Sequence, residues 1–194
     1  MGYHIYTTDG IILKRTPFGE ANILLYVLTY DFGLITASAK SVRLSASKLR
    51  PALQEYNHIS ISCIKSKNGW KVTNVIDKGS LFFGYPEYSH KILSQISSVL
   101  LKMITGESPH KEIFEIVRSG FKFLKDVKEE YVVNFEILMV FRILFELGYV
   151  EKIDNFKKFL DNITDWNDDI LRQISEEKFV LVGAINKALR ESHL

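Results

Sequence analysis

Five short segments in which apolar and polar residues alternate restrict what the first 80 residues of this chain can fold into. The alternation is clear over residues 35–40 and 59–63, and it predicts strands with one buried face, because successive side chains of a strand point to opposite sides. We predict strands at 6–15, 22–30, 33–40, 57–65 and 69–77. Asn68-Gly69, between the last two, favours a tight hairpin turn, since both central residues of that turn need positive φ.

The connection between the third and fourth predicted strands is the longest of the four. Five short strands with a long third connection fit a small Greek-key barrel of the oligonucleotide-binding (OB) type. An SH3-like barrel fits the number of strands almost as well. Asp31-Phe32-Gly33 lies between the second and third strands and is interpreted as a hairpin turn.

Beyond Gly84-Tyr-Pro86 the apolar period changes from two residues to about 3.6, which predicts helices. Ser108-Pro109 and Ser175-Glu-Glu177 have the residue types of helix starts. The segment from Glu130 to Leu147 is apolar nearly all round, so we expect a helix at the centre of a bundle. The residues predicted to share helical faces are Ile92, Ile96, Val99, Leu100 and Met103; Ile113, Val117, Phe121 and Leu124; and Leu181, Ile185 and Ala188.

These patterns predict an α+β protein with two domains of different charge. Residues 1–80 are expected to form an N-terminal five-stranded OB-type β-barrel, and residues 81–194 a C-terminal all-helical domain. The first part holds 10 Lys+Arg against 5 Asp+Glu, a net charge of +5, and the second holds 15 against 18, a net charge of −3. This asymmetry favours nucleic acid or another anionic partner for the first part.

The positive charge of the first part is concentrated after the third predicted strand. Between Asp31 and Glu55 the chain carries four cationic residues and no acidic one, so a polyanion could bind there. Lys and Arg side chains contact phosphates with little regard to sequence, and such affinity falls steeply with salt. The ordinary alternative is a solvated surface. The candidate nucleic-acid-binding residues are Lys14, Arg15, Lys40, Arg43, Lys48 and Arg50.

Three aromatic residues of the first part have two interpretations. Tyr26, Tyr56 and Trp70 could stack on bases, as aromatic residues do in other single-strand binders. Alternatively, each belongs to the core or cap of the barrel. The second interpretation is favoured for all three.

The sequence lacks the motifs of common enzymes and metal sites. Its five His residues show no pair at the spacing of helical metal ligands, and no Gly-x-Ser-x-Gly or Walker pattern occurs, so we expect no catalytic residue, metal or cofactor. The single cysteine, Cys63, rules out an internal disulfide, and its alternating context predicts a buried thiol. The N-terminus lacks a secretory-signal pattern and the longest apolar run is interrupted by charges, so we expect a soluble, cytoplasmic protein with no membrane segment.

Several segments together resemble the N-terminal pattern of the RecO family of recombinational DNA repair mediators. They are Asp9-Gly-Ile-Ile-Leu-Lys-Arg15, Phe18-Gly-Glu-Ala-Asn22, Leu28-Thr29, Gly33-Leu-Ile-Thr-Ala-Ser-Ala-Lys-Ser-Val-Arg43 and Ser47-Lys-Leu49. Farther on, Ile143-Leu-Phe-Glu-Leu-Gly-Tyr149 resembles the end of the family's central helix. The order and spacing of these segments make the resemblance fairly specific.

The resemblance implies an OB-fold followed by a helical domain, with no catalytic chemistry. It implies binding and annealing of single-stranded DNA and cooperation with RecR in loading RecA onto DNA that is coated by single-stranded-DNA-binding protein. The basic Ala-Lys-Gly-x-Arg segment of the family, implicated in DNA or RecR contact, corresponds to Ala39-Lys40-Ser41-Val42-Arg43, where Ser41 stands in place of the glycine.

The resemblance also implies a site for the acidic, phenylalanine-ended C-terminal tail of the single-stranded-DNA-binding protein. Such a site needs an apolar pocket edged by cations on the helical domain. Arg118, Lys122 and Lys125 on one predicted helix, or Lys157 and Lys158, could supply the cations or could be ordinary solvated residues.

Two other classes of function are compatible with the same residues. The first is a non-catalytic OB-fold protein-interaction scaffold, in which the barrel binds a protein and its positive charge is incidental. The second is an enzyme with an unrecognised site. Salt-sensitive binding of single-stranded DNA distinguishes the mediator from the scaffold.

We predict that the purified, untagged protein carries no stoichiometric zinc. Many RecO-family members have a cysteine cluster for zinc after the Leu-Gly-Tyr motif, whereas residues 150–159 of this chain contain no cysteine. Elemental analysis after dialysis measures the metal content. Zinc retained at one equivalent would contradict the prediction.

Overall fold

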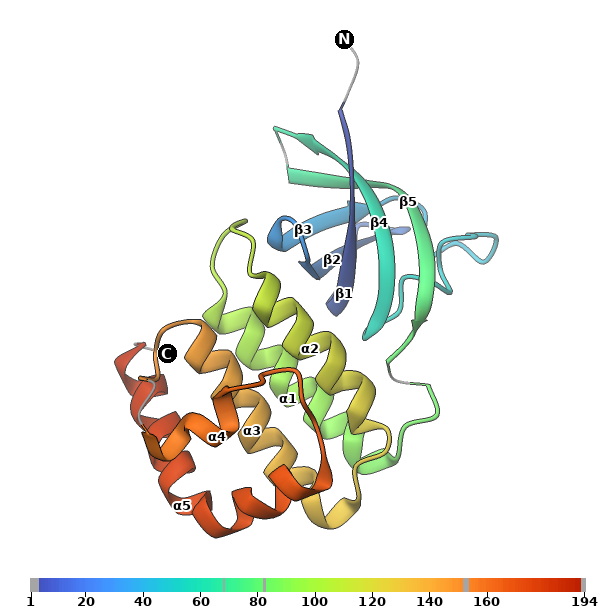
Figure 1. Ribbon diagram of the computed structural model, residues 1–194. Coiled ribbons are helices and arrows are strands. Elements are labelled where there is room, and N and C mark those ends of the chain that lie inside the picture. Colours follow the sequence, from blue (N-terminus) through green and yellow to red (C-terminus); the bar gives the residue numbers. More distant parts are fainter. Residues whose placement is uncertain (1–3, 68, 82, 152–153, 193–194) are drawn as a thin grey trace. The chain divides into compact units, whose positions relative to one another are not determined.

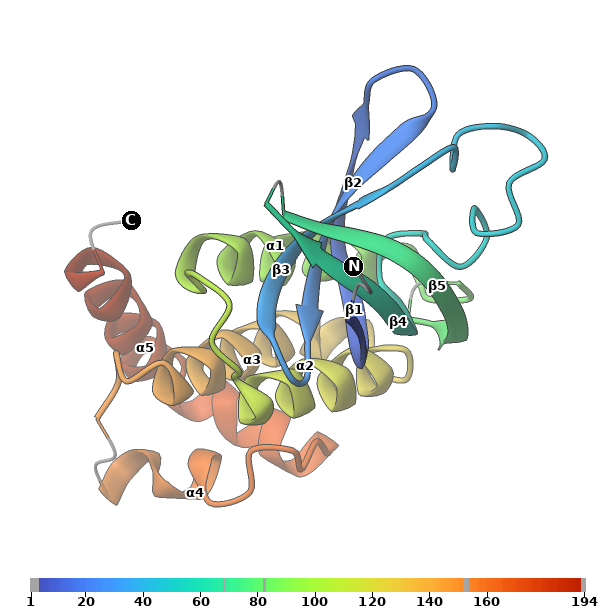
Figure 2. The same cartoon turned by 90° about the horizontal axis from the view of Figure 1, so that it is seen from above.

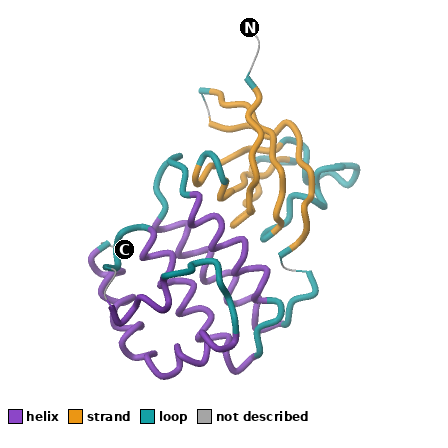
Figure 3. The backbone as a smooth tube through the Cα atoms, in the orientation of Figure 1, coloured by secondary structure: helices purple, strands orange, loops and turns teal. Residues whose placement is uncertain are grey.

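The protein consists of five strands followed by helices, as the computed structural model shows (Figures 1 and 3). The structure describes residues 4–67, 69–81, 83–151 and 154–192. The chain divides into two compact units: Met1–Phe83 with Ile104–Lys111, and Gly84–Met103 with Glu112–Leu194. The predicted α+β class, with an N-terminal β part and a helical part after it, is confirmed.

The first unit is built on a closed barrel whose strands neighbour one another in the order β1-β2-β3-β5-β4. All five predicted strands are present: β1 Ile5–Phe18, β2 Asn22–Thr29, β3 Gly33–Ala39, β4 Asn57–Ser66 and β5 Gly69–Ser80. Neighbouring strands are antiparallel except β3 and β5, which are parallel. The predicted turn at Asn68-Gly69 falls partly outside the described residues, because Asn68 does; Gly69 has φ +92°.

Strand β1 is longer than predicted because it serves two neighbours. Its first half, from Ile5 to Ile11, pairs with β4, and its second half, from Gly10 to Phe18, pairs with β2. The pairing with β2 shifts between Ile12 and Lys14, where one extra residue bends the strand. This bend lets one strand take part in both sides of a closed barrel.

The interior of the barrel is filled by the apolar side chains that the two-residue period predicts. They come from every strand and from the long connection between β3 and β4, and Cys63 lies among them as predicted. Trp70 is also buried here, and its ring packs edge-on against Tyr6 and at a tilt against Phe32, with centroid distances of 5.4 and 5.3 Å. The core residues are Ile12, Ile23, Leu25, Val27, Ile35, Ala37, Ala39, Val42, Leu53, Ile59, Ile61, Cys63 and Trp70.

The segment Ile104–Lys111 belongs to the barrel unit although it lies between two helices in the sequence. The Glu107 carboxylate accepts hydrogen bonds from the Trp70 indole (2.9 Å) and from the Lys65 ammonium (2.5 Å). The bond from Lys65 holds the pKa of Glu107 below its ordinary value, against the opposing effect of burial. This docking was not predicted from the sequence.

The turn between β2 and β3 is the predicted hairpin turn at Asp31-Phe32-Gly33. The Thr29 hydroxyl donates to the Gly33 carbonyl (2.8 Å) and accepts from the Phe32 N–H (3.1 Å). Gly33 has φ +64°, and a Cβ atom there would lie 2.1 Å from the Ser108 carbonyl oxygen. Only glycine fits at this position, because both the backbone conformation and the close approach of the docked segment exclude a side chain.

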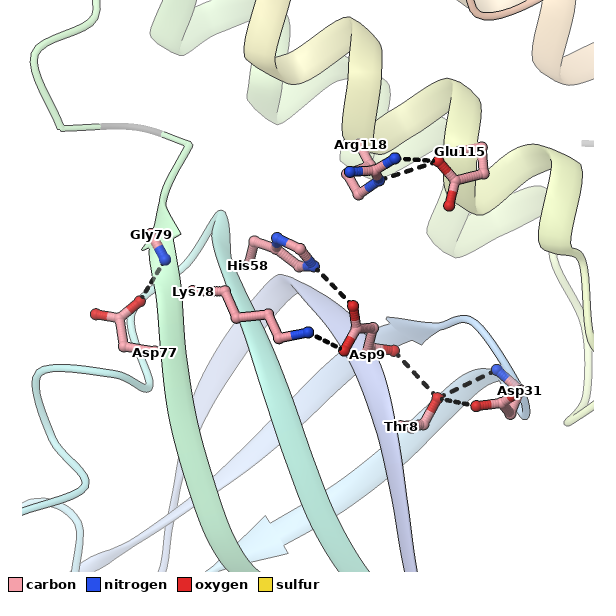
Figure 4. A network of polar contacts seen from close by, with 9 residues as sticks. All are labelled: Thr8, Asp9, Asp31, His58, Asp77, Lys78, Gly79, Glu115 and Arg118. Atoms are coloured by element: carbon pink, nitrogen blue, oxygen red, sulfur yellow. Dashed lines mark hydrogen bonds and ion pairs between the residues drawn. The ribbon is translucent and has the colours of Figure 1, made fainter.

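Asp9 of β1 joins three strands on the barrel through polar contacts (Figure 4). Its carboxylate lies 2.6 Å from the Lys78 ammonium of β5 and 3.4 Å from Nε2 of His58 in β4. Burial raises the pKa of Asp9, but the hydrogen bond and charge of Lys78, together with His58, hold it below its ordinary value. Lys78 is therefore neutralised within the barrel.

The described residues of the second unit form helices and the turns and loops that join them, without a strand. The unit contains α1 Glu87–Met103, most of α2 Lys111–Leu124, the short 3-10 turns Glu129–Tyr131 and Asp154–Phe156, α3 Val132–Glu146, α4 Lys157–Leu160 and α5 Asp168–Glu191. Eleven of the 15 residues of α3 are buried, so the prediction of a central helix is confirmed. The predicted apolar faces of α1, α2 and α5 are buried as well, except that Val99 is only half-buried.

Both predicted helix starts are wrong. Helix α2 begins at Lys111, two residues after Pro109, because residues 104–110 are part of the segment that docks on the barrel. Helix α5 begins at Asp168, where the Asn167 side chain accepts a hydrogen bond from the Ile170 N–H (2.9 Å). Ser175 lies inside that helix and accepts a hydrogen bond from the buried Asn134 amide (2.7 Å). An Asn cap followed by two carboxylates is the stronger start signal.

Arg142 of α3 is a fully buried cation that fixes the segment between α4 and α5. Its Nε donates to the Phe159 carbonyl (2.9 Å), its Nη1 donates to the Asp165 carbonyl (2.8 Å), and its guanidinium lies 4.4 Å from the Trp166 ring centroid. Burial lowers the pKa of Arg142 to about 10, opposed by the Asp165 charge, so the group stays charged at neutral pH. One helix residue thus orders a stretch that has little regular structure of its own.

None of the described helices is long and apolar enough to cross a membrane.

Arg142→Ala is expected to lower the free energy of unfolding by about 3–5 kcal/mol, because two buried carbonyls lose their donors and a cavity remains. The matched control is Arg118→Ala, which removes a half-exposed arginine paired with Glu115 and should cost less than about 1 kcal/mol. Denaturant unfolding followed by circular dichroism measures both. Equal, small effects of the two substitutions would contradict the role given to Arg142.

Candidate nucleic-acid interface

The basic loop, residues 40–56, extends away from the strands of the barrel (Figure 2). Its apolar side chains anchor it to the barrel core. Val42 and Leu53 are fully buried and Leu49 packs against the same core. The cations Lys40, Arg43, Lys48 and Arg50 are exposed on this loop, as the sequence predicted. The alternation of anchoring apolar residues and exposed cations gives the loop a fixed base and a charged outer surface.

The start of the basic loop has the backbone conformation that glycine favours. Ser41, which replaces the glycine of the family segment, has φ +57°. Its N–H donates to the Asn22 side-chain oxygen (2.9 Å), and Ser41 therefore keeps the left-handed turn without a glycine. Arg43 follows: its N–H donates to the Ala21 carbonyl and its Nη1 to the Gly19 carbonyl, at 2.9 and 3.1 Å. These bonds hold the loop against the turn between β1 and β2.

A polar row crosses the outer surface of the barrel beside this loop. The pairing of the strands places Lys14 opposite Tyr26, and Tyr26 opposite Thr36. Residues directly opposite on neighbouring strands point to the same side, with Cβ atoms about 5 Å apart. Because Leu25 and Val27 point into the core, Tyr26 points outward, and Lys14 and Thr36 are exposed.

A second row runs next to the first and adds another cation. It consists of Thr16, Leu24, Ser38 and Lys71, which are opposite one another in that order across β1, β2, β3 and β5. We call the two rows together the strand face. The strand face thus presents Lys14 and Lys71 on either side of Tyr26 and Leu24, with Lys40 at the end of β3.

Lys71 was missed from the sequence. It comes to the strand face only because β3 and β5 pair in parallel at Ala37–Trp70 and Ser38–Lys71, and that pairing joins residues more than 30 positions apart. Its alternation with the buried Trp70 was the signal that it points outward. Its position next to β3, however, depends on the order of the strands in the barrel and could not be predicted from the local sequence.

The six predicted residues occupy different places in the structure. Lys14 lies on the strand face, and Lys40 and Arg43 lie where the basic loop leaves β3. Lys48 and Arg50 lie farther along the loop. Arg15 turns to the other end of the loop, where its guanidinium donates to the Gln54 side chain and its N–H donates to Glu55 Oε1 (2.9 Å).

The availability of a cation for phosphate depends on whether it already has an anionic partner. Lys65 is paired with Glu107 and Lys78 with Asp9. Within the described residues, by contrast, no ion pair engages Lys14, Lys40, Lys48 or Lys71. These four lysines of the strand face and basic loop are therefore available to bind an anion.

The predicted burial of two of the aromatic residues is confirmed. Trp70 and Tyr56 are buried, at 3% and 8% exposure, and cannot stack on a base in this structure. Tyr26 is half-buried, with its ring on the strand face. It is the aromatic residue of the three that remains available.

In the described part of the chain, no group of three or more His, Cys, Asp or Glu side chains is arranged so that it could hold a metal ion. The expectation that the protein carries no zinc stays a prediction.

Comparison with known proteins connects this barrel to one family. The family described as "Recombination protein O N terminal" matches residues 1–76, which contain β1 to β4 and most of β5. The chain is 26% identical over 155 residues to the DNA repair protein RecO of Thermodesulfovibrio yellowstonii, covering 77% of this chain and 60% of that protein. Over residues 1–76 the chain is thus similar to the RecO family, and the similarity to relatives of that name extends over 77% of the chain.

Two further relatives have the same name and differ in the part that matches. The DNA repair protein RecO of Heliobacterium modesticaldum is 26% identical over 152 residues, covering 77% of this chain and 54% of that protein. The RecO protein of Dehalococcoides mccartyi is 41% identical over 64 residues, 33% of this chain and 25% of that protein. The chain thus spans little more than half the length of the first two relatives.

Ser41 offers a test of the geometry at the start of the basic loop. Ser41→Gly should raise the free energy of unfolding by up to about 1 kcal/mol, and Ser41→Val should lower it by roughly 1–2 kcal/mol, because a β-branched residue is strained at positive φ. Chemical denaturation of the three proteins gives the order. Equal stability of the glycine and valine variants would mean that residue 41 is not left-handed in solution.

Proposed function

We propose that this protein is a DNA repair and recombination mediator whose barrel binds single-stranded DNA. The observation that carries the proposal is the strand face: unpaired cations on both sides of an outward tyrosine, next to a loop of further cations. Single-strand binders combine a cationic track for the phosphates with aromatic rings on which bases stack. Binding of this kind has little sequence preference and needs no catalytic residue, so we propose that the protein is not an enzyme.

The barrel itself supports this use. We propose that it is of the OB type, since it has five strands, closes in the order β1-β2-β3-β5-β4 and has its longest connection between β3 and β4. OB-folds bind oligonucleotides on the face of strands 2 and 3 and on the loops next to them. Here that face carries Tyr26, Leu24, Thr36 and Ser38, with Lys14 and Lys71 on the adjoining strands.

The wider role follows from the family. We propose that the protein anneals single strands and, with RecR, helps to load RecA on DNA coated by single-stranded-DNA-binding protein. Its relatives are named DNA repair proteins, which supports a role in repair. Annealing needs a surface that neutralises two phosphate chains without reading their bases, and a strand face that carries flexible Lys side chains meets that need.

We place the protein partners on the helical unit. For the acidic tail of the single-stranded-DNA-binding protein, the structure narrows the candidate cations. Arg118 is paired with Glu115 and Lys158 with Glu177, which leaves Lys122 of α2 and Lys157 of α4 as the better candidates. Lys125 was predicted to lie on the same helix as Arg118, but it lies one residue beyond the end of α2.

The rival proposal is a non-catalytic OB-fold scaffold that binds a protein through its barrel. It is supported by the modest sequence identity of 26% to the first relative, at which two related proteins can differ in their binding partners. The two proposals differ in salt dependence, because phosphate binding releases counterions and an apolar protein contact does not.

Replacing the strand-face cations tests the proposal. The double variant Lys14→Ala/Lys71→Ala should weaken binding of single-stranded DNA of any sequence and reduce the slope of log K against log salt by roughly 0.7 for each phosphate that the variant no longer neutralises. Lys40→Glu/Arg43→Glu should weaken it further, since repulsion replaces attraction. Fluorescence anisotropy of a labelled oligonucleotide at several salt concentrations measures both effects.

The matched control removes two exposed lysines of the helical unit, Lys102→Ala/Lys178→Ala, which changes the net charge by the same amount as the alanine double variant of the strand face. This control should leave the affinity and its slope within a factor of about two, because both lysines belong to the helical unit and not to the proposed interface. If all three double variants behave alike, or if the parent protein binds no single-stranded DNA, the proposed interface is wrong.

A further inference from the structure

The barrel unit contains a pocket that the proposed DNA track does not use. Its volume is about 480 Å³, and it lies between the end of the basic loop and the last part of β5. The lining residues on which its chemistry depends are Arg15, Glu55, Tyr56, Asn57, Asp77 and Phe83. Pockets of roughly 300–1,000 Å³ hold small organic ligands, and a nucleoside is at the small end of that range.

The floor of the pocket is fixed by backbone hydrogen bonds. Tyr56 has φ +65°, a conformation that non-glycine residues rarely adopt. Its N–H donates to the Ile12 carbonyl (2.7 Å) and its carbonyl accepts from the Leu81 N–H (3.0 Å). The Asn57 amide donates to the carbonyls of Pro51 and Ala52, at 3.3 and 3.1 Å. The pocket is therefore formed before any ligand arrives.

The polar groups around the pocket mostly accept hydrogen bonds. Glu55 uses Oε1 to accept from the Arg15 N–H, and Asp77 uses Oδ1 to accept from the Gly79 N–H (2.8 Å). The second carboxylate oxygen of each, and Oδ1 of Asn57, have no hydrogen-bond donor among the described residues. Such a set of oxygens suits a ligand that presents N–H donors.

Phe83 gives the pocket an aromatic wall. Its side chain is 85% exposed, the second most exposed of the large apolar residues described. An exposed phenyl ring at a pocket edge loses this unfavourable contact with water when a flat ligand covers it. A flat ring that carries an N–H₂ group could stack on the phenyl ring and donate hydrogen bonds to the carboxylates.

We propose that this pocket takes up one unstacked nucleobase that has an exocyclic amine, namely adenine, cytosine or guanine, from a bound single strand. The inference rests on the proposed function, because the strand must first be held by the barrel. The ring would lie on Phe83, its amine would donate to Asp77 or Glu55, and Arg15 at the same pocket would face the neighbouring phosphate. Thymine has no exocyclic amine and would fit less well.

Charge favours a base over the other ligand class that such a pocket could accept, a lysine or arginine side chain of a protein. The pocket adjoins the basic loop, whose four cations lie within 17 residues of sequence, and Arg15 itself lines the pocket. A basic peptide would be repelled there. A nucleic acid brings its own negative phosphates to the loop and a neutral base to the carboxylates, so each part of the strand meets complementary charge.

The test uses thymine oligonucleotides roughly 12 nucleotides long, a length within the site size of OB-folds, with one central 2-aminopurine, a fluorescent base that carries an exocyclic amine. Binding to the full chain is followed by anisotropy, and the exposure of the base by quenching with acrylamide. We expect the bound 2-aminopurine to be shielded from acrylamide. Phe83→Ala should remove the shielding, Phe83→Trp should keep it, and Ile76→Ala, which truncates another exposed apolar residue of the same unit, should not change it.

The carboxylates are tested by Glu55→Gln/Asp77→Asn, which keeps the oxygens that accept from Arg15 and Gly79. Removing two negative charges should strengthen binding of all-thymine DNA, yet the preference for strands with one central adenine or cytosine, expected to be roughly three- to tenfold, should disappear. If DNA binds with an unshielded base and no such preference, the pocket inference is overturned and the proposed function stands. If no DNA binds at all, both fail.

Discussion

The parallel pairing of β3 with β5 is the contact on which the first unit depends. It consists of the register Ala37–Trp70 and Ser38–Lys71, and it converts a meander of antiparallel strands into a closed barrel. Closure buries Trp70 in the core, and the buried indole then needs an acceptor, which Glu107 supplies from a distant segment. The same pairing turns Lys71 outward beside Ser38. One short stretch of backbone hydrogen bonds thus determines the core, the docking of residues 104–111 and part of the candidate interface.

The strands and the basic loop could be predicted from the sequence because their signals are local. A two-residue period shows which face of a strand is buried, and a run of cations free of carboxylates remains exposed in any arrangement of the strands. The central helix could be predicted for the same reason, since its sequence is apolar on nearly every face and such a helix must be buried. These features make up most of the fold and about half of the candidate interface.

The remainder depends on contacts between residues that are far apart in the sequence. Nothing near Lys71 marks it as a neighbour of β3, and nothing near Glu107 marks it as the acceptor for Trp70. The helix start at Ser108-Pro109 was wrong because these residues belong to the segment that docks on the barrel, and α2 begins after them at Lys111. The start at Ser175 was wrong because the helix already begins at Asp168 after the Asn167 cap, and the Ser175 hydroxyl instead accepts from the buried Asn134 amide of α3. Glu107 and Ser175 thus satisfy a buried indole and a buried amide that lie far from them in the sequence.

The burial of Cys63 has a practical consequence. It is the single cysteine of the sequence, and desolvation raises its pKa to about 12, so its sulfur stays a protonated thiol at neutral pH and is poorly nucleophilic. Alkylating dyes react with thiolates at the surface and leave such a group untouched. A cysteine introduced at an exposed position of the basic loop, such as Lys48, would consequently be the one reactive thiol of the native protein. Spectroscopic probes can then be attached to this loop at a chosen residue while the natural core remains intact.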